Sequence, residues 1–104
     1  MSRVDTFRAM VAQHPENALA RFGLANELLK ARLWDEAVEH LRIYLGKYDD
    51  EGNGWGRLAE ALLALDRADE ARDALQKGIA ASHRFGHVGM ANELEARLEE
   101  LDDA

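Results

Sequence analysis

The chain has 104 residues, one proline and no cysteine, and 47% of its residues are hydrophobic, which fits a single domain with one modest core. The lack of cysteine excludes disulfides and thiolate metal sites, and no apolar run approaches the roughly 20 residues that cross a bilayer. The net charge of −7, without a basic stripe, excludes a typical nucleic-acid binder, because phosphate neutralisation supplies most of that affinity.

The first predicted element is a helix over residues 3–14, with apolar positions at Phe7, Met10 and Val11. We interpret it as an N-terminal capping helix or as the second helix of an incomplete hairpin. No apolar segment follows the basic Arg3, so a secretory signal is not expected. We therefore expect a cytoplasmic protein whose partner is neither a nucleic acid nor a membrane.

The next two segments, residues 18–51 and 52–85, are predicted to be repeats of one another. Residues 18–45 align with residues 52–79 at an offset of 34 without a gap. The identical positions are Leu24, Ala25, Leu28, Leu29, Asp35, Glu36, Ala37 and Leu41, which fall on Leu58, Ala59, Leu62, Leu63, Asp69, Glu70, Ala71 and Leu75. Most of these positions are apolar or small, so the repetition concerns the core of each unit.

Each unit is predicted to contain two helices. Apolar residues recur at helical spacing in both halves, and the acidic pair Asp35–Glu36 lies where the second helix would begin. Acidic side chains there face the positive end of the helix dipole. The small residues Ala25 and Ala37 would let the two helices of the hairpin approach closely, while leucines fill the flanks.

These features resemble the tetratricopeptide repeat family, whose 34-residue hairpins carry small and large apolar residues at fixed spacing. The matching residues are Leu24, Ala25, Leu28, Ala37 and Leu41, then Trp55, Leu58, Ala59, Leu62, Ala71 and Leu75, with Pro15 at the position of a closing proline. The resemblance implies an all-α fold over residues 1–104, a right-handed superhelical stack of antiparallel helix hairpins. It would comprise two full repeats, with capping helices at the N- and C-termini.

Four residues depart from the family pattern. The turn inside each hairpin commonly has glycine, but here the residues are Arg32 and Asp66. Arg21 stands in the first unit where Trp55 stands in the second, and Tyr44 likewise corresponds to a glycine. We therefore expect one hairpin to be packed more tightly than the other.

The last predicted element is a capping helix over residues 87–101. The 34-residue register fails after residue 82, and a shift of about two residues restores the apolar stripe. We expect a slightly longer loop around Phe85–Gly86 to produce this shift. The stripe that would cover the end of the stack comprises Met90, Ala91, Leu94, Leu98 and Leu101.

The sequence offers little for catalysis, so we expect a protein that is not an enzyme and has no cofactor. Its histidines are not paired with a serine or cysteine nucleophile by any recognisable motif. His83 and His87 have i, i+4 spacing, but no third ligand is evident and no metal site is expected. The segment Gly52–Gly56 lacks the strand and lysine of a phosphate loop, and a hinge or close-packing role is favoured.

The resemblance implies a protein–protein interaction module with a concave groove lined by the first helix of each repeat. The candidate partner-binding residues are Leu19, Phe22, Asn26, Leu29, Lys30, Asn53, Gly56, Arg57, Glu60 and Leu63. The alternative for Phe22 and the leucines is ordinary core packing. The alternative function is a self-associating structural unit that dimerises through exposed repeat ends.

Chaperone-tail binding is not expected from this groove. Family members that bind such tails use basic residues and asparagines over three repeats. Asn26 matches one asparagine, but Phe22 stands where a lysine is expected, and a cap replaces the third repeat.

We predict that Ala37→Leu or Ala71→Leu destabilises the domain by about 1 to 3 kcal/mol, because a larger side chain overpacks the close contact within a hairpin. Chemical denaturation measures this effect. Wild-type midpoints for both variants would show that the repeat register is wrong.

Overall fold

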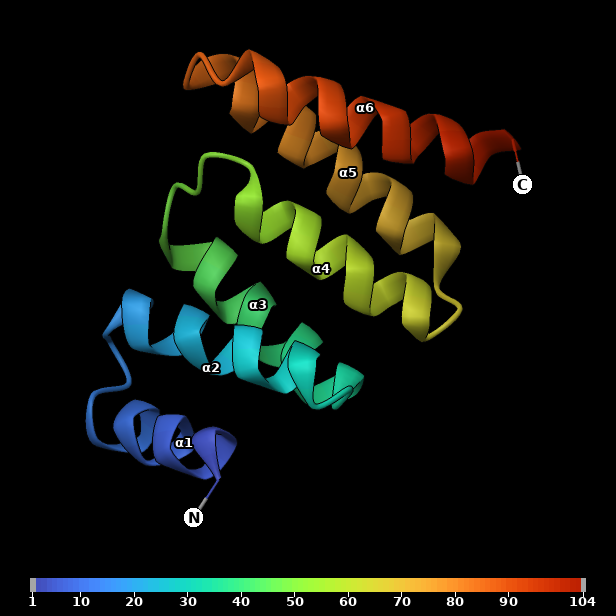
Figure 1. The fold of residues 1–104 in the computed structure, drawn as a ribbon. Helices are drawn as coiled ribbons and strands as arrows, with labels where there is room; N and C mark the ends of the chain where they lie inside the picture. The colour runs from blue at the N-terminus through green and yellow to red at the C-terminus, as the bar shows by residue number, and fades with distance from the viewer. Residues whose placement is uncertain (1, 104) are drawn as a thin grey trace.

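The computed structural model describes residues 2–103, which form an all-α stack of antiparallel helix hairpins. The six helices are α1 (Arg3–Gln13), α2 (Ala18–Lys30), α3 (Trp34–Lys47), α4 (Asn53–Ala64), α5 (Ala68–Arg84) and α6 (Val88–Asp103). Each helix packs against the next, and α2 also touches α4. Figure 1 shows α2, α4 and α6 side by side, with α3 and α5 on their far side. The stack therefore has two layers, and α2, α4 and α6 form one of them.

The core is formed by the residues that the two repeats share. The four repeat alanines Ala25, Ala37, Ala59 and Ala71 are each 0% exposed. The leucines beside them that recur in both repeats are at most 1% exposed; they are Leu24, Leu28, Leu41, Leu58, Leu62 and Leu75. Small side chains at the contact and leucines at its flanks let the paired helices interlock closely.

The turns within the hairpins use left-handed residues that are not glycine. Arg32 has φ 60° and Asp66 has φ 59°, as expected for the positions where the family commonly has glycine. The next amide in each turn closes the preceding helix: the Leu33 N–H donates to the Leu28 carbonyl at 2.9 Å. Arg67 and Leu62 form the same bond in the second hairpin. These backbone bonds hold the turns despite the unfavourable residue type.

The connection between the two hairpins is organised by the buried carboxylate of Asp50. One of its oxygens accepts the backbone N–H groups of Gly52 and Gly54, both at 2.8 Å. The other accepts the Tyr44 hydroxyl at 2.7 Å. Burial and this hydrogen bond raise the pKa of the Tyr44 hydroxyl far above its ordinary value. The carboxylate thus ties the end of α3 to the start of α4.

In the first hairpin, buried Arg21 takes the place that Trp55 has in the second. Its guanidinium donates to the Pro15 carbonyl and to Nδ1 of His40, both at 2.9 Å. The accepting Nδ1 must be unprotonated, and burial and the Arg21 charge lower the pKa of His40. Arg21 therefore joins the α1–α2 connection to α3.

The structure corrects the expectation of a longer loop before the last helix. The connection is Phe85–His87, which is shorter than the Tyr48–Gly52 connection between α3 and α4, whereas α5 is longer than α3. Ala91 and Leu94 are buried as Ala59 and Leu62 are, 32 positions later (91 − 59) instead of 34. The 34-residue register is therefore lost in α6, and α5 ends in a tight turn at Gly86, whose φ is 76°.

We predict that Tyr44→Phe lowers the free energy of unfolding by about 2 kcal/mol, because Asp50 loses a buried hydrogen-bond donor. Tyr48→Phe is the matched control, since Tyr48 is 48% exposed. Urea denaturation of both variants tests this. Equal midpoints would rule out a stabilising role for the Tyr44–Asp50 bond.

The lowered pKa of His40 predicts acid sensitivity. The folded chain binds the His40 proton less readily than the unfolded chain, so this contribution to stability is present above about pH 6.5 and is lost as the pH falls. Unfolding measured at about pH 7.5 and about pH 5.5 should show a larger loss for the wild type than for His40→Asn, whose amide oxygen can accept from Arg21 without titrating. The same loss in both proteins would assign the effect to other groups.

Candidate functional site

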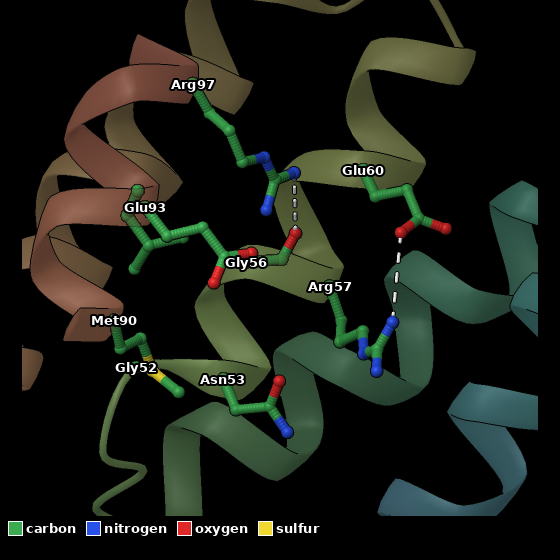
Figure 2. A pocket seen from close by; sticks show the side chains of 9 residues that line it. Gly52, Asn53, Gly56, Arg57, Glu60, Met90, Glu93 and Arg97 are labelled. Carbon is green, nitrogen blue, oxygen red and sulfur yellow. Dashed lines mark hydrogen bonds and ion pairs between the residues drawn. The ribbon is translucent and has the colours of Figure 1, made fainter. Parts of the chain in front are cut away.

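A recess of about 380 Å³ lies between α4 and α6 on the layer formed by α2, α4 and α6. It is lined by Gly52, Asn53, Gly56, Arg57, Glu60, Met90, Glu93, Leu94 and Arg97. Figure 2 shows the side chains of Arg97, Glu93 and Met90 on α6, across from Asn53, Arg57 and Glu60 on α4. Four of the residues predicted for the groove, Asn53, Gly56, Arg57 and Glu60, thus line one recess together.

Bare backbone at Gly56 lets α6 approach α4. The Arg97 guanidinium donates to the Gly56 carbonyl at 3.2 Å, as the dashed line in Figure 2 marks. A Cβ on Gly56 would lie 3.2 Å from both the Leu94 and the Arg97 side chains, which is tighter than ordinary contact. Gly56 therefore allows the close packing of the two helices, and its carbonyl already accepts the hydrogen bond from Arg97.

The charges of the recess are balanced. Arg57 and Arg97 supply two cations, and Glu60 and Glu93 supply two carboxylates. Arg57 and Glu60 approach only to 4.0 Å, and both side chains are nearly half exposed, so their attraction is weak in water. The recess can therefore offer donors and acceptors together to a ligand that has both, as a peptide backbone does.

The predicted residues on α2 divide between surface and core. Leu19 is 76% exposed, and exposed Lys30 pairs with Glu27 at 3.1 Å. Asn26 is half-buried, and its side-chain oxygen is buried without a hydrogen-bond partner. Phe22 is half-buried and stacks on the Tyr44 ring at 4.8 Å between centroids, so most of its surface belongs to the packing between α2 and α3.

Leu29 corrects the predicted set. It is only 6% exposed and packs in the core, so it cannot offer a side chain to a partner. Its counterpart in the second repeat, Leu63, is 39% exposed. Leu29 and Leu63 occupy the same repeat position but differ in solvent exposure, because their neighbours in the stack differ.

The sequence did not identify the α6 side of the recess. Met90 and Leu94 were assigned to capping alone, and no role in binding was predicted for Glu93 or Arg97. The apolar stripe of α6 placed the helix against the stack correctly. The apolar stripe did not indicate which polar residues beside it would face α4.

The rings of His83 and His87 do not face a common point. His83 lies 3.4 Å from Glu95, and His87 lies 3.0 Å from Glu51, so each ring faces a different carboxylate. Within residues 2–103, no group of three or more His, Cys, Asp or Glu side chains is placed to hold a metal ion. Nor does any helix in this range have the length and apolar character needed to span a membrane.

Comparisons with known proteins agree with this architecture. A family model described as a tetratricopeptide repeat matches residues 4–51 and residues 22–83. The chain is 31% identical over 101 residues to TPR repeat-containing protein PA0015 from Pseudomonas aeruginosa, covering 97% of this chain and 96% of that protein. It is also similar to the solution structure of protein BPP2914 from Bordetella parapertussis, with 28% identity and a TM-score of 0.84, over 99% of this chain and 90% of that one.

Proposed function

Because the chain belongs to the tetratricopeptide repeat family, we propose that it is a non-catalytic interaction module that binds a peptide segment of a partner protein across α2, α4 and α6. Repeats of this family generally mediate protein–protein interaction. For this chain, we place the binding surface on the layer of α2, α4 and α6 and expect it to recognise a peptide backbone.

The observation that carries the proposal is the recess between α4 and α6. It is about 380 Å³, open to solvent, and lined by charged side chains of both signs around a small apolar floor of Met90 and Leu94. An extended peptide presents backbone donors and acceptors along its length with side chains between them. A mixed lining suits such a ligand better than it suits a purely anionic or apolar one.

The unpartnered oxygen of Asn26 supports the extension of this surface to α2. A buried carbonyl oxygen without a donor lacks the hydrogen bond that it would make in water, which is costly. A peptide N–H that reached Asn26 would supply the missing donor. Leu19, at the exposed start of the same helix, would add apolar contact.

Self-association is a second candidate function. An apolar patch at the hairpin turns supports it. Leu33 is 42% exposed and lines a recess of about 300 Å³ together with Trp34 and Leu65. Two copies could cover this patch against each other. Mass measured in solution over a range of concentrations distinguishes this candidate, because a dimer would dissociate on dilution.

To test the proposal, a photo-crosslinking amino acid is placed at Asn53 in the intact chain, with Gln76 on α5 as the matched exposed control. We expect a partner to crosslink from Asn53 and not from Gln76. The purified partner is then titrated against the double variant Arg57→Ala, Glu60→Ala. A loss of about 2 kcal/mol in binding free energy is expected if these residues belong to a hot spot.

The melting temperature of the double variant is the control for folding, and it should match the wild type because both side chains are nearly half exposed. Phe22 is left intact, since it stacks on Tyr44. Unchanged affinity in the folded variant, or crosslinking from Gln76 alone, would contradict binding in this groove.

A further inference from the structure

A second surface lies on the other layer of the stack, between α3 and α5. Two recesses of about 430 Å³ and 170 Å³ meet there and share Leu45, Gly46, Trp55 and Lys77. We call their union the α3–α5 furrow. Leu45, the half-buried Trp55 ring and Leu58 line it, so it offers an apolar floor on the layer opposite the α4–α6 recess.

Two glycines shape this furrow in different ways. A Cβ on Gly78 would lie 2.9 Å from the Cβ of Trp55, so bare backbone there lets Trp55 lie against α5. Gly46, in the last turn of α3, has no atom within 4 Å of where its Cβ would lie. Packing therefore does not require Gly46, and its missing side chain leaves the furrow open beside Leu45 and Trp55.

The residues that line the rim of the furrow include more cations than carboxylates, although the chain as a whole carries −7. Four cations line it, Arg42, Lys47, Lys77 and Arg84, against the two carboxylates of Asp49 and Asp50. Both Asp50 oxygens are already engaged by buried donors. The α4–α6 recess has equal numbers of each sign, and the recess at the hairpin turns has more acids than cations.

The cations of the rim are available to an incoming anion. Arg42, Lys77 and Arg84 hold exposed carboxylates of this chain at 2.9, 3.0 and 2.6 Å. Such exposed pairs contribute little net free energy in water, so another carboxylate can replace them. None of the ion pairs within residues 2–103 involves Lys47. The Lys77 ammonium also lies 5.7 Å from the Trp55 ring centroid, where cation and ring hold each other in place.

We propose that the α3–α5 furrow binds an acidic segment of a partner protein, with an apolar side chain on Trp55 and Leu45 and carboxylates on Lys47 and Lys77. This surface is separate from the α4–α6 groove. It favours an anionic ligand, whereas the acidic chain as a whole favours cations. The negative chain as a whole repels an acidic segment, whereas the furrow offers it Lys47 and three cations whose own exposed carboxylates are weakly held.

The probe is a fluorescein-labelled synthetic peptide of glutamates interspersed with leucine and phenylalanine, titrated against the intact chain at low salt. We expect saturable binding followed by anisotropy, weakened at least tenfold at high salt or in the double variant Lys47→Ser, Lys77→Ser. Backbone amide shifts in nuclear magnetic resonance spectra should change at Gly46, Lys47 and Lys77.

The matched control is Lys30→Ser, Arg57→Ser, which removes the same charge from the other layer. It should bind the acidic probe as well as the wild type does, so failure of the furrow and failure of the α4–α6 groove are distinguishable. The same peptide with glutamine in place of glutamate should not bind. Equal weakening by both double variants, equal binding of the glutamine peptide, or amide shifts confined to the α4–α6 recess would overturn the proposal.

Discussion

Close contact between the paired helices of each hairpin is the constraint on which the rest of the structure depends. Ala25 and Ala37 in one hairpin, and Ala59 and Ala71 in the other, are fully buried, so the helices approach as nearly as a methyl group allows. Leucines on either side then fill the space between successive helices. Because each helix packs mainly on its chain neighbours, the stack keeps two long exposed layers instead of closing around one centre.

The junction between the hairpins shows how local backbone chemistry positions a functional surface. The Asp50 carboxylate holds the first amides of α4 and the Tyr44 hydroxyl, which sets where α4 begins relative to α3. From that start, Gly56 falls where α6 crosses, and its carbonyl is taken by Arg97. The recess between α4 and α6 therefore depends on a carboxylate that does not line it.

The two layers differ in charge because the repeat constrains mainly the interior and leaves most surface positions different in the two hairpins. The positions shared by both hairpins are core leucines and alanines together with the acidic pairs that begin α3 and α5. Surface positions differ between the repeats, and they give a balanced lining on one layer and a lining with more cations than carboxylates on the other. Arg21 and Trp55 show the same freedom inside the fold, since one repeat position holds a buried guanidinium in one hairpin and an aromatic ring in the other.

The sequence by itself determined the features that depend on short-range spacing. The 34-residue repetition located both hairpins, the turn positions of Arg32 and Asp66, the buried alanines and the loss of the repeat register before α6, because helical periodicity and turn chemistry depend on neighbouring residues. The family resemblance, and not the spacing, pointed to four residues that line the α4–α6 recess, Asn53, Gly56, Arg57 and Glu60. The packing of the whole chain was needed to show that α5 is longer than α3, that Leu29 is buried while Leu63 is not, and that Arg97 of α6 meets Gly56 of α4. These outcomes depend on how far and at what angle one helix crosses another, and that geometry arises from the packing of the whole stack.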